Sequence, residues 1–558
     1  MSNLLKNKTF WVFVALIATF IAYMPVFQND FVNWDDDYYI TGNNLIQSFD
    51  LTSVKTWFSR PFMGLYQPMI LVSLALDYSI NGNDPVIFHT TNLMLHLLNT
   101  LLVFVFLSGL LKNDRVSIMA TLLFGLHPIH VEAVAWATER KELLYGFFYL
   151  LALVSYLQFL KQQKTRWLLT TFILFIFSLL SKASAVTLPL VLVLLDYLHE
   201  RIWPDRKVIL EKLMFFIPAL VFGLLTLYWH RSYGSLVNAS GFSLPERAFL
   251  AGRGLMYLLS KTIWPLDLSA YNQLPGNIGI GIILEIFFYW ALIGIALYTL
   301  IRMRLNNRML IFGAGFFLLT IFLFLIPPGV PVLISERYAY LPSIGLFVII
   351  GVGFNRVFNK QKMVRDIGVA VLGIYLLFIM FLTFQQSKTW RNSLSLWNHV
   401  IEVRGDLAYP LYQKGNAYRE KGEYDKALQN FDRALQKRPR LARVLENRGH
   451  IYLLLNNYES AISDLNKATT LDPESEYAHC TLGFAYRHTG EFNKAIKHLN
   501  KAIELKKDYA DAYFNRGKIY LEQGNTTEAC ADLKQSLHLD LDQGNAREAR
   551  QLISENCR

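Results

Sequence analysis

The chain has 558 residues, of which 53% are hydrophobic and 14% aromatic, and its mean hydropathy is +0.27. These values exceed those of ordinary soluble domains and predict an integral membrane protein. The formal net charge is +11. In a membrane protein such an excess gathers in cytoplasmic loops, so it does not indicate nucleic-acid binding.

Apolar runs that suit membrane spans recur along residues 1–386. The expected spans are 10–27, 86–111, 115–127, 142–160, 166–181, 184–199, 213–230, 279–301, 309–326, 336–356 and 366–386. With these eleven spans every basic cluster falls on one side, as the positive-inside rule requires. Two further apolar pieces, 67–80 and 246–265, must then stay on the outer face; the second carries charges that suit an interfacial helix. The first run lacks a small-residue cleavage site and is interpreted as a retained anchor.

An acidic stretch, 33–39, follows the first span and holds Asp35, Asp36 and Asp37 between aromatic residues. Charges beside hydrocarbon are costly and by default mark a functional site. A solvated turn after a helix end is the alternative interpretation.

Other polar residues gather on the same outer face. They are Tyr66, His89, His127, His130, Glu132, the run Glu139-Arg140-Lys141-Glu142, Lys182, Glu336 and Arg337. Two histidines and Glu132 are metal-ligand types, but Pro128 and the short spacing fit no standard site. A helix end with hydrogen-bonded histidines explains the same residues. Arg337 presents a planar fork that suits a phosphate, or pairs only with Glu336.

Several motifs resemble the transmembrane-and-TPR-containing (TMTC) proteins. They are Phe31-Val32 before Asp35-Asp36, Tyr66-Gln67-Pro68, His127-Pro128-Ile129-His130-Val131-Glu132-Ala133-Val134, Glu142-Leu143-Leu144, Trp264-Pro265-Leu266, Ser335-Glu336-Arg337 and Tyr340-Leu341-Pro342-Ser343-Ile344-Gly345. That family is related to protein O-mannosyltransferases and other glycosyltransferases of the GT-C fold. The resemblance therefore implies a polytopic GT-C-type body that takes a sugar, mannose, from a polyprenyl-phosphate carrier.

The resemblance also implies that the acidic motif is the active site. The family usually shows two acidic residues where this chain has three; Asp35-Asp36 aligns best, and either one is a candidate base. Transfer needs a carboxylate that accepts the proton of the acceptor hydroxyl, and cations near the departing phosphate. For the phosphate we expect Arg337, Arg140 and Lys182. The residues expected to line the site are Tyr66, His89, His127, His130, Glu132 and Glu336. No cofactor is assigned, and a divalent metal stays an open alternative.

A period of 34 residues begins near residue 408. It is carried by Gly415, Gly449, Gly483 and Gly517, and tyrosines and alanines repeat with it. This is the tetratricopeptide (TPR) signature. We expect a membrane body over 1–386, a linker over 387–407, repeats at 408–443, 442–475, 476–509 and 510–543, and a capping helix and tail over 544–558. The expected fold class is all-α, with a TPR α-solenoid after the membrane helices.

One repeat position carries a polar stripe, formed by Gln413, Asn447, Thr481 and Asn515. It resembles, incompletely, the asparagine ladder of O-GlcNAc transferase repeats, so we expect it to bind the acceptor peptide. A spacer or dimerisation surface is the alternative, because a fold alone does not fix a function.

The expected function is a glycosyltransferase of the cytoplasmic membrane, which moves the sugar to hydroxyl groups of exported proteins on the outer, periplasmic side. The partners are the bilayer, the lipid-linked sugar and an acceptor held by the repeats. A non-enzymatic scaffold for envelope assembly is one alternative. A transporter of lipid-linked sugar is another, but it would place ionisable groups near the membrane midplane.

The three cysteines are Cys480, Cys530 and Cys557, and they show no CxxC or metal-ligand spacing. If the repeats lie in an oxidising compartment, a bridge between Cys530 and Cys557 is expected, because the capping helix should run antiparallel to the helix before it. Three reduced cysteines that act as small apolar fillers are the alternative.

Overall fold

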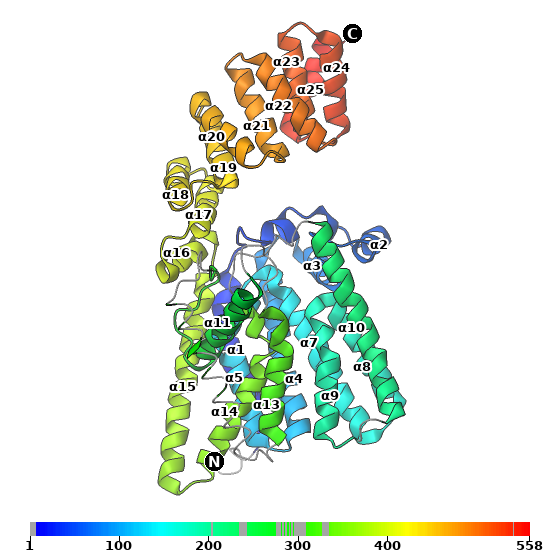
Figure 1. Ribbon diagram of the computed structural model, residues 1–558, viewed down its shortest axis with the longest axis vertical. Coiled ribbons are helices and arrows are strands. Elements are labelled where there is room, and N and C mark those ends of the chain that lie inside the picture. The colour runs from blue at the N-terminus through cyan, green and yellow to red at the C-terminus, as the bar shows by residue number, and fades with distance from the viewer. Residues whose placement is uncertain are drawn as a thin grey trace. The chain divides into compact units, whose positions relative to one another are not determined.

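The computed structural model describes residues 7–201, 205–233, 243–274, 308–325, 334–539 and 541–557, with isolated helical positions between 281 and 294. The chain divides into two compact units, Met1–Val403 and Arg404–Arg558. Within these described residues no strand forms, and β-bridges are isolated, as between Phe62 and Leu65. The predicted all-α fold class is confirmed (Figure 1).

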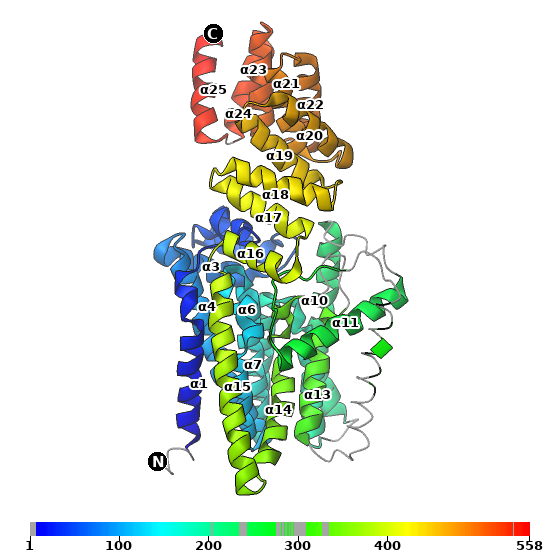
Figure 2. The same ribbon diagram turned by 90° about the vertical axis from the view of Figure 1, so that its left-hand side faces the viewer.

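The first unit is a bundle of apolar helices. They are α1 (Lys8–Tyr23), α2 (Leu51–Ser59), α3 (Pro68–Asn81), α4 (Pro85–Leu111), α5 (Asp114–Leu126), α6 (Val131–Ala135), α7 (Arg140–Gln162), α8 (Thr165–Ser181), α9 (Leu188–Leu198), α10 (Arg206–Ser232), α11 (Leu244–Ile263), α13 (Arg308–Ile321), α14 (Ser343–Phe358), α15 (Lys362–Thr389) and α16 (Ser393–Arg404). The axes of α1, α7 and α15 are roughly parallel to one another in Figure 2.

Five helical segments among the described residues are long and apolar enough to cross a membrane. They are Lys8–Gln28, Pro85–Leu111, Ala137–Gln162, Arg206–Ser232 and Lys362–Thr389. A sixth forms if α5 and Pro128–Ala135, which bend by 51°, count as one span. Shorter apolar helices are Pro68–Asn81, Thr165–Ser181, Ala183–Leu198, Arg308–Phe324 and Ser343–Phe358. A count of eleven spans is not confirmed, and the expected span 279–301 lies outside the continuously described residues.

Helix α15 shows how this unit meets lipid. Over its 28 residues only Ile379, Thr383 and Ser387 are buried, whereas Ile374 and Leu377 are each 69% exposed. An apolar surface of this kind suits acyl chains rather than water. The neighbouring helices α13 and α14 pack with their backbones in contact at Gly313 and Gly345. The approach is so close that a Cβ on Gly345 would collide with the carbonyl oxygen of Gly313.

The second unit is a solenoid of paired helices. They are α17 (Ala408–Glu420), α18 (Tyr424–Lys437), α19 (Ala442–Leu454), α20 (Tyr458–Leu471), α21 (Glu476–His488), α22 (Phe492–Leu505), α23 (Ala510–Glu522), α24 (Thr526–His538) and α25 (Gln543–Asn556). The repeated glycines mark where the two helices of a pair touch. A Cβ on Gly449 would lie 2.9 Å from Cγ of Leu465, and one on Gly483 would lie 2.6 Å from Cγ of Leu499.

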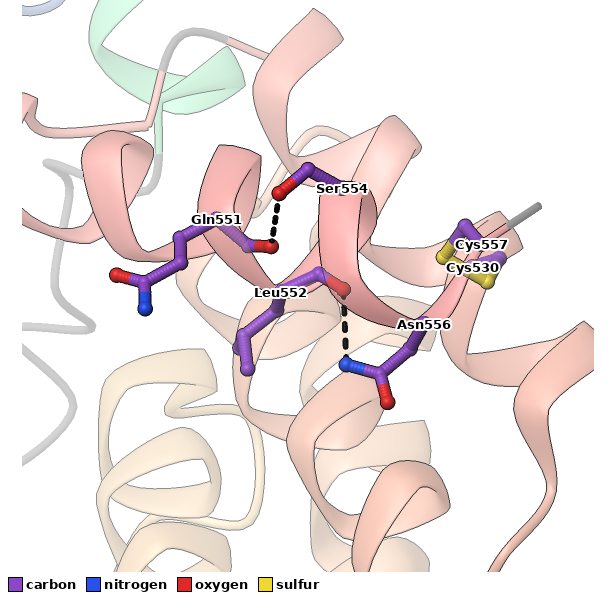
Figure 3. Close-up of a disulfide and its surroundings, with 6 residues drawn as sticks. All are labelled: Cys530, Gln551, Leu552, Ser554, Asn556 and Cys557. Atoms are coloured by element: carbon purple, nitrogen blue, oxygen red, sulfur yellow. Dashed lines mark hydrogen bonds between the residues drawn. A yellow bond between two sulfur atoms is a disulfide. The ribbon is translucent and has the colours of Figure 1, made fainter.

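The C-terminal end of the solenoid is held by a disulfide. Cys530 of α24 is bonded to Cys557, which follows α25, and their Cα atoms are 5.7 Å apart (Figure 3). The apolar face of α25 packs against the last repeat, with Ala546 and Ala549 buried beside Leu533. The predicted bridge is therefore confirmed, and Cys480 is a buried free cysteine.

Candidate active site

Asp36 holds the acidic stretch in place. Its carboxylate accepts hydrogen bonds from the backbone N–H groups of Val32 at 2.9 Å and Thr138 at 3.1 Å. The residue is only 1% exposed. Burial raises the pKa of Asp36 to about 7, while the two backbone donors act in the opposite direction. Because both oxygens are engaged, Asp36 ties the stretch to the turn Ala137–Glu139 that precedes α7 and has little room for a substrate.

Asp35 has different surroundings. Its side chain is 35% exposed, and one carboxylate oxygen lies 3.8 Å from Nζ of Lys141. Burial raises the pKa of Asp35 above its ordinary value, and the charge of Lys141 partly opposes that rise. Of the two candidate bases, Asp35 is therefore the one that a substrate can reach.

Asp35 and the largely buried charged residues around it form a group that we call the charge cluster. Its members are Asp35, Glu132, Glu139, Lys141, Glu142, Lys182 and Arg337. Arg337 bonds Glu132 through its backbone N–H at 3.0 Å and through its guanidinium, and its Nε lies 3.2 Å from Glu139. Nζ of Lys141 lies 2.9 Å from the same Glu139 oxygen, so Glu139 joins the two cations.

The second part of the charge cluster is the ion pair between Lys182 and Glu142. The Lys182 ammonium also lies 5.2 Å from the ring centres of Phe324 and Tyr338. On the other side, the guanidinium of Arg337 lies 5.0 Å from the Tyr338 ring centre. Tyr338 thus stands between Lys182 and Arg337, and the geometry favours one binding region with a cation on each side.

Apart from Asp35, the cations of the charge cluster are slightly more exposed than its glutamates. The side chains of Lys141, Lys182 and Arg337 are 10%, 11% and 15% exposed. Those of the paired glutamates are 0–2% exposed. The glutamates are therefore the more deeply buried partners, and the small exposed fraction of each pair belongs to the cation. That arrangement suits an anionic ligand such as a phosphate.

Arg140 lies elsewhere, although it is adjacent to Lys141 in sequence. Its guanidinium bonds Asp77 of α3 at 2.5 Å and, on α4, the side chain of Asn92 at 2.8 Å and the carbonyl of Phe88 at 2.7 Å. Its side chain is fully buried. Successive residues of a helix point about 100° apart, so Arg140 ties α3 and α4 to α7 while Lys141 enters the charge cluster.

The two histidines of the helix bend are hydrogen-bonded to their surroundings. Nδ1 of His127 accepts from the backbone N–H of Ile129 at 3.2 Å, and its Nε2 lies 3.1 Å from the carbonyl of Thr262. His130 contacts the carbonyl of Phe124 at 2.8 Å and the hydroxyl of Ser343 at 2.9 Å. The described part of the chain contains no group of three His, Cys, Asp or Glu residues able to hold a metal. The structure thus matches the helix-end interpretation.

The remaining predicted residues are spread around the body. Glu336, next to Arg337, is buried and accepts from the Tyr257 hydroxyl at 2.6 Å and the Ser269 N–H at 2.7 Å. The Tyr66 hydroxyl donates to the carbonyl of Phe58, and its ring packs against Trp229 of α10. His89 is buried on α4. The structure therefore brings Asp35, Glu132, Lys182 and Arg337 together, and it adds Glu139, Lys141 and Glu142. The charged run 139–142 was the available signal for these three.

The polar stripe of the solenoid is engaged within the repeats. Gln413 accepts from Asn416, and Asn447 donates to Tyr412 and Asn416 at 3.0 and 2.9 Å. The Thr481 hydroxyl donates to the carbonyl of Tyr477, and the Asn515 amide donates to that of Asp511. A peptide would have to exchange these bonds for its own, so the peptide-binding role stays a prediction.

Comparison with known proteins covers both units. The TPR repeat family matches residues 415–456, 449–490 and 485–524, and the tetratricopeptide repeat family matches 510–543. Crystal structures of MamA and of the TPR protein YrrB each match 29% of this chain, at 21% and 23% identity, with 93% and 82% of those chains aligned and a TM-score of 0.26 for each.

The chain is also similar to proteins named protein O-mannosyl-transferase. This chain is 24% identical to mouse TMTC4 over 76% of its own length. It is 25% identical to human TMTC4 over 74% of that length and 25% identical to F38B6.6 of Caenorhabditis elegans over 75%. It spans 66%, 64% and 61% of the length of these relatives. The TMTC resemblance predicted from the motifs is thus confirmed over about three quarters of the chain.

Proposed function

We propose that this protein is a membrane glycosyltransferase that moves a sugar from a polyprenyl-phosphate donor to a hydroxyl group of an exported protein. The observation that carries the proposal is the placement of a partly exposed carboxylate, Asp35, 3.8 Å from Lys141 in a charge cluster that also holds Arg337 and Lys182. Mannose is the first candidate sugar, because the relatives are named protein O-mannosyl-transferases.

In the proposed reaction, Asp35 acts on the acceptor hydroxyl, and Arg337 and Lys182 act on the departing phosphate. The acceptor hydroxyl oxygen attacks the anomeric carbon and forms the new glycosidic bond. Asp35 accepts the hydroxyl proton as that bond forms. The bond between the anomeric carbon and the phosphate oxygen breaks, and its electron pair leaves with the lipid phosphate. Arg337 and Lys182 stabilise the added negative charge on that phosphate.

The glutamates keep the cations charged and in place when no phosphate is bound. A buried cation without a counter-ion is costly, and Glu132, Glu139 and Glu142 supply that charge in the free protein. The bound phosphate then adds to these contacts from the accessible side. Asp36 bonds the acidic stretch to Thr138 in the turn before α7, and it acts as a positioning residue for its neighbour Asp35.

The proposal places the site and the repeats on the outer side of the cytoplasmic membrane. Support comes from the disulfide between Cys530 and Cys557, because such bonds persist in oxidising compartments and are rare in the cytosol. The solenoid would then hold the acceptor protein.

The test is direct transfer. Purified full-length protein is incubated with radiolabelled polyprenyl-phosphate mannose and envelope protein, and label in protein is measured with the wild type and with Asp35→Asn. Label that depends on Asp35 supports the proposal. Equal label with both proteins would rule out the assigned base, and no label with polyprenyl-phosphate mannose, glucose or N-acetylglucosamine would favour a non-enzymatic scaffold.

A further inference from the structure

Helix α16 and the turn before it make direct contact with the acidic stretch. The backbone N–H of Asn33 donates to the hydroxyl of Ser393 at 2.9 Å. The indole N–H of Trp397 donates to the side-chain carbonyl of Asn33 at 2.8 Å. Three residues before Asn33, the Asp30 N–H donates to the carbonyl of Arg391 at 2.8 Å. Asn33 lies two residues before Asp35, so these bonds act on the segment that carries the proposed base.

Stacked tryptophans reinforce this attachment. Trp34 packs on Trp397 at a ring separation of 5.2 Å and on Trp136 at 4.6 Å, and Trp136 stacks on Trp390 at 5.5 Å. Trp136, Trp390 and Trp397 are at most 2% exposed. Trp136 also faces the cations, with the Arg337 guanidinium 5.3 Å from its ring centre.

A separate contact joins α16 to the segment behind Arg337. Nε2 of His399 lies 3.0 Å from the carbonyl of Leu268, and the next residue, Ser269, donates its N–H to Glu336. Glu336 precedes Arg337 in the chain. Helix α16 therefore contacts two segments of the site. One carries Asp35, the proposed base, and the other bonds Glu336, the neighbour of Arg337.

We propose that α16 is a positioning element of the transferase site, in which Trp397 fixes the location of Asp35 through Asn33. This inference rests on the proposed function, and it gives 387–404 a task beyond linking two units. The physical reason is that a general base must lie within hydrogen-bonding distance of the hydroxyl that it deprotonates. A displacement of about 1 Å costs on the order of 10²-fold in rate.

The decisive variant is Trp397→Phe in the full-length protein. It keeps an aromatic ring in the stack but removes the indole N–H that bonds Asn33, together with part of the ring volume. We expect kcat to fall about 10- to 100-fold, with the KM for the lipid-linked sugar changed less than about twofold, because the phosphate ligands are untouched. Asn33→Ala deletes the same bond from the other side. The double variant should lose little more than the worse single variant, since partners in one contact are not additive.

Trp57→Phe is the matched control. Trp57 is likewise buried, and its indole N–H donates to a backbone carbonyl, that of Leu45, at 2.9 Å. The control thus loses an equivalent bond away from Asn33. Its kcat should stay within about threefold of the wild type. A loss as large as that of Trp397→Phe would show that any buried indole matters equally, and would overturn the assignment.

A second measurement does not depend on activity. Backbone hydrogen exchange of residues 30–36, followed by mass spectrometry, should accelerate in Trp397→Phe and stay unchanged in Trp57→Phe. Unchanged exchange, or an unchanged kcat with an active wild type, overturns the positioning role alone. A wild type that transfers no sugar overturns the proposed function instead, and the exchange result then reports only a structural contact.

Discussion

The Asp35 carboxylate and the Lys141 ammonium lie 3.8 Å apart, farther than a hydrogen bond, whereas Lys141 lies 2.9 Å from Glu139. Lys141 thus favours the ionised form of Asp35 without occupying its lone pairs. Asp36 shows the opposite situation, because two backbone N–H groups take up its oxygens. Adjacent residues of identical chemistry are thereby given different tasks.

Replacing each aspartate by asparagine should separate these tasks. Asp35→Asn removes the proton acceptor at a partly exposed position, so transfer should fall about 10²- to 10⁴-fold at an unchanged melting temperature. Asp36→Asn turns an amide NH₂ toward a buried backbone donor. It should lower the free energy of unfolding by about 1–3 kcal/mol, measured by thermal unfolding in detergent. A stable Asp36→Asn protein without activity, beside an active Asp35→Asn protein, would reverse the assignment.

The pH dependence of transfer should report the environment of Asp35. Burial raises its pKa, and the base works only when ionised, so kcat/KM should fall as the pH drops through a value above the ordinary aspartate pKa of about 4. Lys141→Met removes the charge that opposes this rise, and the acid limb should therefore move to higher pH. A limb that moves to lower pH, or does not move, would contradict the contact.

Sequence patterns predicted the repeats well because their signal is physical and periodic. Each repeated glycine meets the same partner helix, as Gly449 meets Leu465 and Gly483 meets Leu499. The membrane part was harder to delimit. Hydropathy indicates which segments are apolar, but α13, with 14 residues, and α14, with 16, are shorter than a usual span. The bend at Pro128 is a proline effect that a hydropathy count does not reveal.

The site was predictable in its chemistry and less so in its membership. The charged run 139–142 indicated a functional region, but deciding that Lys141 and not Arg140 enters the charge cluster requires the phase of α7 at its first turn, and that phase depends on packing. The contact between Trp397 and Asn33 joins residues 364 positions apart. No local pattern encodes such a pairing.

Arginine-to-lysine changes should distinguish Arg337 from Arg140. Both keep a positive charge but lose the planar fork. In Arg337→Lys the ammonium cannot bond Glu132 and Glu139 and also face a phosphate, so the KM for the lipid-linked sugar should rise about tenfold, or about 1.4 kcal/mol. In Arg140→Lys the contacts to Asn92 and Phe88 are lost, so the melting temperature should fall while KM stays within about twofold. The reverse pattern would place Arg140 at the phosphate.

Cysteine labelling tests which side of the membrane carries the site. Asn83, between α3 and α4, and Gln163, between α7 and α8, are both exposed. In intact cells a membrane-impermeant maleimide should label Asn83→Cys and leave Gln163→Cys unlabelled until the cells are opened. The native background is low, since Cys480 is buried and the other two cysteines are bonded. Labelling only at position 163 would reverse the proposed orientation.

The disulfide offers an independent test of the same orientation, together with a stability effect. The bond joins residues 27 positions apart and fixes α25 to the last repeat. Closing a loop of this size in the unfolded chain stabilises the folded form by about 3.5 kcal/mol. The variant with Cys530→Ser and Cys557→Ser should therefore unfold at lower temperature, whereas Cys480→Ala should keep the linkage.

Protein purified without reductant and then denatured should show one reactive thiol, with Cys530 and Cys557 in a linked peptide. Three reactive thiols would mean that the repeats stand in a reducing compartment, and they would contradict both the bridge and the outer location of the site.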